Sequence, residues 1–174
     1  MWVDGGEGFA ELLRGFERSA WRWECQGTYP DPAEREPMQA WRDGRLDAEF
    51  MTEWLAQIRR LRAAGQVFER VRMLTEPLTE YLRWMISLTP LNVEAGEDIR
   101  WIAERDARQL DVPAYDFYLF DDRIVARLHF DETGVAGVEL SDEPGTVAEH
   151  RRWRNQLWRA ATPHDEKFAA TRSP

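Results

Sequence analysis

The chain has 174 residues, of which 43% are hydrophobic, and its formal net charge is −9. A chain of this length fits one domain that buries roughly 70% of the surface that the unfolded chain exposes. The acidic balance argues against nucleic acid as a direct partner, because phosphate backbones are bound mainly by Lys and Arg. The single cysteine allows no intrachain disulfide, and we recognise neither a signal peptide nor an apolar run near the ~20 residues of a membrane span. We therefore expect a cytoplasmic protein.

Hydrophobic periodicity predicts a helix, a strand, two helices and a second strand in the first half of the chain. In chain order these elements cover residues 7–18, 19–29, 33–42, 47–64 and 66–74, after a frayed start at residues 1–6. In the first strand, Trp21 and Trp23 alternate with Arg22 and Glu24, which is typical of a strand with one buried face. The second strand places two arginines on one face, between apolar residues.

The second half of the chain contains the segment with the clearest pattern, residues 116–140, in which three apolar runs are joined by two turn signals. The first run, residues 117–120, has no polar face, so we expect a strand that is covered on both sides of a sheet. Asp121 and Asp122 end this run, and Gly134 suits the hairpin turn between the second and third runs. The segment should be the centre of a β-sheet.

Further elements are expected on both sides of this sheet centre. A helix over residues 78–88 should be interrupted by Thr89 and Pro90, since proline removes a backbone donor. A short turn at 92–95, a strand at 99–104 and a polar loop through Pro113 follow, and the last helix should end at Pro163. Residues 164–174 have the composition of a disordered tail.

These elements predict an α+β fold with one domain over residues 1–163 and a mixed β-sheet of about five to seven strands flanked by helices. The nine tryptophans are unusually many for this length. They are either bulky core residues or the lining of a cleft or an interface, because a buried indole N–H needs a partner. A homodimer through a Trp-rich surface therefore stays open.

No catalytic or metal-binding motif is recognised. The three histidines are scattered without the spacing of metal ligands, and the glycines form no phosphate-binding loop. Cys25 lies in an apolar alternation and is interpreted as a small buried hydrophobic residue, not as a nucleophile. We expect neither a cofactor nor a metal.

The candidate binding residues are charged and aromatic side chains on or beside the inner strands and the helix at 78–88. They are Glu24, Arg70, Arg72, Glu76, Tyr81, Arg83, Arg100 and Trp101. Convergent arginines can hold a carboxylate or a phosphate with two hydrogen bonds each. The alternative is that the arginines pair with neighbouring acids and fix the loop at 94–98, since ion pairs at sheet edges often have no binding role.

Four segments of the chain resemble DUF6879, a family of uncharacterised actinobacterial proteins. They cover residues 21–29, 76–83, 89–100 and 116–122, and the resemblance extends from about residue 9 to residue 163. Members of the family resemble companions of XRE-type helix-turn-helix regulators, so the resemblance implies a regulatory setting and no established activity.

The C-terminal half is also similar, more distantly, to half of a phospholipase D-type fold. When Asp121 is placed at the catalytic Asp of that family, Ala114 and Asp116 stand where its His and Lys should be. The resemblance therefore implies the fold without phosphodiesterase chemistry, and such folds commonly serve in ligand sensing or interaction.

Three functions follow from these patterns. The first is a non-enzymatic regulatory module that engages a protein partner, a helix-turn-helix regulator. The alternative is a sensor that holds a small anion with Arg70, Arg72, Arg83 and Arg100. The third is an enzyme of unrecognised type in specialised metabolism, with Glu24, Glu76 or Asp98 as acid or base.

Overall fold

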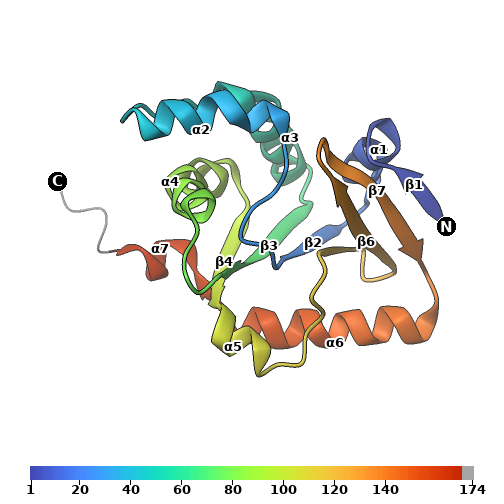
Figure 1. Cartoon of the computed structure of the whole chain (residues 1–174). Helices are drawn as coiled ribbons and strands as arrows, with labels where there is room; N and C mark the ends of the chain where they lie inside the picture. The colour runs from blue at the N-terminus through green and yellow to red at the C-terminus, as the bar shows by residue number, and fades with distance from the viewer. Residues whose placement is uncertain (170–174) are drawn as a thin grey trace.

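A computed structural model describes residues 1–169 of the protein as a mixed β-sheet with helices on both faces (Figure 1). In chain order the elements are β1 (Trp2–Asp4), α1 (Glu7–Gly15), β2 (Ser19–Glu24), the 3₁₀-helix η1 (Pro32–Glu34), α2 (Arg35–Arg42), the 3₁₀-helix η2 (Glu49–Met51), α3 (Thr52–Ala63), β3 (Val67–Leu74), α4 (Glu80–Ala95), β4 (Asp98–Ala103), α5 (Glu104–Arg108), β5 (Phe117–Phe120), β6 (Ile124–Asp131), β7 (Gly134–Ser141), α6 (Pro144–Ala160), β8 (Thr162–Pro163) and α7 (His164–Lys167).

The strands form one eight-stranded sheet in the order β1-β7-β6-β5-β2-β3-β4-β8. β3 runs parallel to β2 and β4, and the other neighbouring pairs are antiparallel. The expected single-domain α+β fold with a mixed sheet is confirmed, but the sheet is larger than five to seven strands. The strands at its two ends, β1 and β8, have only three and two residues, which is too short for a periodic pattern.

Two layers of helices cover the sheet. α2, α3 and α4 lie on one face, and α5 and α6 lie on the other (Figure 1). The crossovers from β2 to β3 and from β3 to β4 both move the chain in the same direction across the sheet, so a constant handedness places their helices on the same face. We call this face, which also packs against α1, the helical face.

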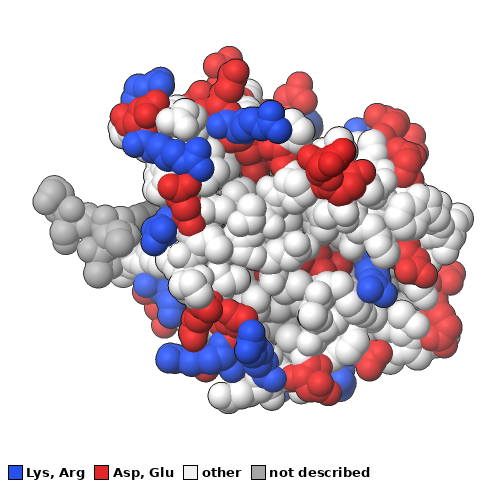
Figure 2. Space-filling view, in the orientation of Figure 1, with Lys and Arg blue, Asp and Glu red and all other residues white. Residues whose placement is uncertain are grey.

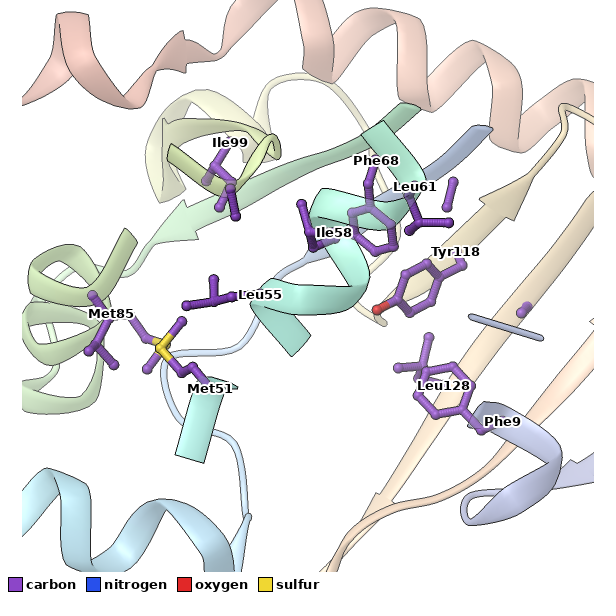
Figure 3. Packing of buried hydrophobic residues seen from close by; sticks show 14 of the residues in the cluster. Phe9, Met51, Leu55, Ile58, Leu61, Phe68, Met85, Ile99, Tyr118 and Leu128 are labelled. Atoms are coloured by element: carbon purple, nitrogen blue, oxygen red, sulfur yellow. The ribbon is translucent and has the colours of Figure 1, made fainter. Parts of the chain in front are cut away.

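The helical face carries the larger part of the core. Ile58 of α3 and Phe68 of β3 are 1% and 2% exposed, and the ring of Phe68 makes an edge contact with Tyr118 at a centroid distance of 6.1 Å. Phe9 of α1 makes a similar contact with Tyr118 at 5.7 Å. Figure 3 shows Phe9, Tyr118 and Leu128 close together, with the Tyr118 hydroxyl on the side of α3. Tyr118 thus joins the sheet centre to α1 and to β3.

The opposite face is also buried along β2, and this corrects the sequence analysis. We expected one buried face. Trp21 and Trp23 pack against Leu157 of α6 on the face opposite the helical face, and Glu24 on the helical face is only 6% exposed. A strand in the middle of a sheet that has helices on both sides is buried on both faces, whatever side chains it carries. The two-sided burial expected for residues 117–120 is confirmed, since every residue of β5 is buried.

Helix α4 differs from its prediction because it continues through Pro90 to Ala95. Proline removes one backbone donor from a helix interior, and the hydroxyl of Thr89 donates to the Met85 carbonyl oxygen at 2.7 Å beside it. Trp84 and Leu88 of this helix are at most 1% exposed. Tertiary packing of the apolar face therefore outweighs the local cost of proline.

Both ends of the chain are more structured than expected. The N-terminal segment forms β1, whose Val3 lies opposite Val138 of β7. Residues 164–169, assigned to a tail, include α7, and Trp101 donates a hydrogen bond of 3.0 Å from its indole nitrogen to Nδ1 of His164. The expected polar loop before Pro113 contains α5, whose Ala107 is buried. The remainder of the expected tail, residues 170–174, lies outside the described residues.

Within residues 1–169, no helix is both long enough and apolar enough to cross a bilayer.

Candidate functional site

The register between β2 and β3 brings four charged side chains together on the helical face. Arg22 lies beside Arg70, and Glu24 lies beside Arg72, on adjacent parallel strands. Side chains alternate along a strand, so all four point to the same side. Arg70, Arg72 and Glu24 are 6%, 7% and 6% exposed, respectively. Charged side chains are rarely buried to this extent unless they are paired.

Glu24 is the centre of the ionic contacts. Its Oε1 accepts a hydrogen bond from Nη1 of Arg70 at 2.7 Å, and its Oε2 accepts one from Nε of Arg72 at 2.5 Å. Nε of Arg22 lies 3.3 Å from Oε1. Burial by itself would raise the pKa of Glu24, but Arg22, Arg72 and Arg70 outweigh it and hold the pKa well below its ordinary value. Glu24 is therefore ionised at neutral pH.

Two further acids complete what we call the charged network, which consists of Arg22, Glu24, Arg70, Arg72, Glu97 and Asp116. Nη2 of Arg70 lies 3.3 Å from Oε1 of Glu97, and the same oxygen accepts a hydrogen bond of 2.6 Å from the Trp54 indole. Nη2 of Arg22 lies 3.3 Å from Oδ2 of Asp116. Burial raises the pKa of Asp116, and the neighbouring Arg22 opposes this shift. Three guanidinium groups thus face three carboxyl groups.

Two adjoining cavities lie over the network. The first has a volume of about 180 Å³ and the second about 310 Å³. Both are lined by Arg22, Asp31, Glu34, Arg70, Arg72 and Met85. The first cavity is otherwise lined mainly by Tyr29, Met73, Tyr81, Leu82, Phe130 and Val135. The second is otherwise lined mainly by Phe9, Leu13, Phe50, Met51, Trp54 and Leu88. A concave, mostly apolar space with a few buried charges is the usual form of a small-molecule site.

Glu34, the last residue of η1, lines both cavities. Burial raises the pKa of its carboxyl group to about 7, although an interaction with the Tyr81 hydroxyl acts in the opposite direction. Its Oε2 is buried and accepts no hydrogen bond from any residue that the structure describes. Glu34 thus differs from Glu24, which is held ionised by three arginines.

A donor of the network also lacks a partner. Nε of Arg70 is buried and donates no hydrogen bond to a residue within 1–169. A buried donor without an acceptor costs about 1–3 kcal/mol. In that same range of residues, no group of three or more His, Cys, Asp or Glu side chains is arranged to hold a metal ion.

The structure brings together about half of the site residues expected from the sequence. Glu24, Arg70, Arg72 and Tyr81 line the first cavity, and the Trp101 ring lies under Arg72, with 5.6 Å between its centroid and the guanidinium carbon. Glu24, Arg70 and Arg72 form salt bridges with one another and also line the cavity. The ligand-site and ion-pair interpretations of the arginines are therefore compatible.

Three expected site residues lie elsewhere. Arg83 of α4 is exposed, and Glu76 is exposed at a turn where its backbone N–H donates to Glu104. Arg100 lies on the opposite face of the sheet, where its guanidinium carbon is 3.7 Å from the Trp158 ring centroid. Along β4, Ile99 and Trp101 belong to the core of the helical face. Arg100 between them must therefore point to the other side.

Several residues of the site were not in the expected set, and Arg22, Asp116 and Glu34 are the most important of them. Arg22 could have been included from its alternation with Trp21 and Trp23. Asp116 precedes the apolar run of β5, and no pattern marks it as a partner of Arg22. Glu34 lies in a polar segment after Pro32, where acidic residues are ordinary, so its position at the cavity follows only from the tertiary fold.

The fold and the cavity define a single-domain α+β protein with a buried ionic site on one face of a mixed sheet. The chain matches the family model described as "Domain of unknown function (DUF6879)" over residues 7–169. It therefore belongs to the DUF6879 family, as its four sequence segments indicated. A comparison with curated proteins gives no match.

Proposed function

We propose that this protein is a non-enzymatic regulatory module that binds a small molecule in the two adjoining cavities. The observation that carries the proposal is the pair of adjoining cavities, of about 180 and 310 Å³, whose shared lining combines Glu34 with the three arginines of the charged network. A concave space with apolar walls and a few convergent polar groups is typical of a small-molecule site. A ligand there would contact the charged side chains and exclude water from them.

The environments of two residues support a role without covalent chemistry. Burial and the nearby Asp116 carboxylate raise the pKa of the Cys25 thiol far above its ordinary value, which disfavours the thiolate nucleophile. Asp121, the residue aligned with the catalytic Asp in the phospholipase D-like resemblance, binds backbone groups instead. Its carboxylate accepts hydrogen bonds from the backbone N–H groups of Glu17, Arg18 and Ser19.

The enzyme alternative is favoured by one observation. The pKa of Glu34 near 7 would suit a general acid or base at neutral pH. Of the acids suggested from the sequence, Glu24 is held ionised by the arginines, and Glu76 and Asp98 are exposed. An enzyme of this fold would therefore use Glu34.

The protein partner in this proposal is an XRE-type helix-turn-helix regulator in an actinobacterium, as the family resemblance implies. The net charge of −9 suits a basic DNA-binding partner. Trp2 is 57% exposed on the edge strand β1 and offers an apolar contact, either to this partner or to a second copy. Most of the other tryptophans are core residues, including Trp21, Trp23, Trp84 and Trp101.

Thermal unfolding of the full chain with carboxylates, phosphates, amines and neutral molecules tests ligand binding. A single-site ligand at 100 times its Kd adds about 2.7 kcal/mol, which raises Tm by roughly 5–10 °C for a chain of this size. Met85→Phe fills the junction of the cavities and should abolish the shift, whereas Arg83→Ala on the exposed side of α4 should retain it. If no compound class raises Tm, the proposed site is wrong.

The partner is tested separately. The protein should be retained by a helix-turn-helix regulator from the same host and change that regulator's operator binding in a gel shift. No retention and an unchanged gel shift would remove the partner from the proposal while leaving the ligand site in place.

A further inference from the structure

We propose that the ligand is a small organic cation, an amine whose ammonium group pairs with Glu34 and whose apolar body occupies the second cavity. This inference rests on the proposed ligand-binding function and names the chemical class of the ligand. It replaces the anion that the arginines suggested from the sequence.

The first argument is charge balance. The three arginines of the network already face Glu24, Glu97 and Asp116, at N to O distances between 2.5 and 3.3 Å. Glu34 and Asp31 also line these cavities, and neither forms a salt bridge with a residue within 1–169. A carboxylate that becomes ionised without a close counter-ion is costly to bury. The three arginines of the cavity walls are already paired, so a further positive charge is missing beside Glu34.

The second argument is that an internal carboxylate already occupies the anion position. Glu24 accepts hydrogen bonds from Arg70 and Arg72 with both oxygens, which is how two arginines would hold the carboxylate of a ligand. A second anion would have to displace Glu24 and then approach Asp31 and Glu34. Repulsion between the ligand anion and these two carboxyl groups would disfavour binding.

The third argument is the aromatic lining beside Glu34. Tyr29 and Tyr81 lie with ring centroids 6.0 Å apart, and Tyr29 and Phe130 lie 5.3 Å apart. Aromatic faces attract cations, and the Arg22 guanidinium carbon already lies 5.7 Å from the Tyr29 ring centroid. Figure 2 shows acidic side chains at the tip of the β6–β7 hairpin, whose residues Phe130 and Val135 line the first cavity.

The second cavity sets the form of the rest of the ligand. Its lining beyond the charged residues is mostly apolar and comes mainly from α1, η2, α3 and α4, with Phe9, Phe50, Met51 and Leu88 among its members. An apolar group there would gain roughly 25 cal/mol per Å² of buried surface.

The test compares probes that differ in charge and in the presence of an apolar body, measured on the full chain by calorimetry and thermal unfolding. The probes are 2-phenylethylamine, 2-phenylethanol, 3-phenylpropionate, ethylamine and inorganic phosphate. We expect 2-phenylethylamine to raise Tm and bind at least about 10-fold more tightly than the alcohol, as a charged pair implies. Ethylamine should bind more weakly, because it lacks the apolar body.

The matched variants are Glu34→Gln, which keeps the shape of the side chain, and Glu36→Gln, an exposed position on α2. With far-ultraviolet circular dichroism unchanged in both, Glu34→Gln should weaken amine binding at least about 10-fold and Glu36→Gln should not. Binding of 3-phenylpropionate or phosphate without binding of the amines would overturn the inference and keep the ligand site. An amine response that Glu34→Gln leaves unchanged would also overturn it. If no probe and no compound of the wider panel binds, the proposed function falls as well.

Discussion

Arg72 and Glu24 lie side by side on adjacent parallel strands, and Nε of Arg72 donates a hydrogen bond of 2.5 Å to Oε2 of Glu24. Their side chains are only 9% and 8% exposed. The same pair forms part of the wall of the first cavity. The stability of the sheet centre and the shape of the binding space therefore depend on the same charges.

Replacing Glu24 with Gln should destabilise the fold strongly. The substitution leaves Arg22, Arg70 and Arg72 buried without their shared carboxylate, and loss of one partner of a buried ion pair costs about 3–5 kcal/mol. Urea unfolding measures the change in the free energy of unfolding. The control is Glu80→Gln, since Glu80 pairs with Arg42 at the surface and should leave the midpoint nearly unchanged. Equal effects of both variants would contradict a central role for Glu24.

The low pKa of Glu24 in the folded state predicts a loss of stability in acid. The unfolded chain has the ordinary Glu value of about 4.3, so the contribution of Glu24 is fully present above this pH. It declines as pH falls below about 4.3 towards the lower folded pKa, because protons then bind the unfolded state more tightly. Urea midpoints measured between pH 6 and pH 3 should fall more steeply for the wild type than for Glu24→Gln.

Glu34 should have the opposite pH dependence. Its folded pKa of about 7 lies above the ordinary value, so the folded state holds its proton more tightly than the unfolded chain. The contribution of protonated Glu34 to the free energy of unfolding is fully present below about pH 4.3 and is lost as pH rises through 7. Asp31, Glu24, Arg72 and Tyr81 are the groups that act on this carboxyl.

Glu34→Gln removes this titration and should flatten the change in urea midpoint between pH 5 and pH 8. The variant should also be more stable than the wild type at pH 8, where it avoids a buried anion. If the urea midpoint changes by the same amount over this range in the wild type and in Glu34→Gln, the pKa of Glu34 is not perturbed.

Asp121 should be important for stability and not for ligand binding. Its carboxylate accepts three backbone hydrogen bonds at 2.7–2.9 Å, and its φ of 53° lies in the left-handed region. Asp121→Ala should lower the free energy of unfolding by about 1–3 kcal/mol, because three partly buried backbone N–H groups lose a charged acceptor. Asp121→Asn keeps one acceptor oxygen and a residue that tolerates this φ, so it should lose less. Equal losses in thermal or urea unfolding would refute this role.

The regular part of the fold could be predicted because its patterns are local. Alternation of Trp21 and Trp23 with Arg22 and Glu24 identifies a strand whichever neighbour it has, and the hairpin around Gly134 is specified by adjacent residues. The continuation of α4 through Pro90 could not be predicted, since it depends on Trp84 and Leu88 being packed by distant elements. Likewise, β1 is stabilised by its pairing with β7, far along the chain.

The candidate site was predictable only in part for a similar reason. The alternation within β3 places Arg70 and Arg72 on the same face of the strand. The parallel neighbour β2 then brings Glu24 beside both arginines. The side of the sheet that Arg100 faces depends on the register of β4 against β3. The position of Glu34 depends on the path of the connection between β2 and α2, which no periodicity describes.

The central place of β2 has a consequence for how the chain acquires its fold. Its two neighbours are β3, which begins at residue 67, and β5, which begins at residue 117. During synthesis from the N-terminus, one edge of this tryptophan-rich strand stays unpaired until more than two thirds of the chain has been made. Pairing across such a sequence separation is slow, and an open apolar edge invites association with other chains. We expect fragments that end before β5 to aggregate, while the full chain closes both edges of β2.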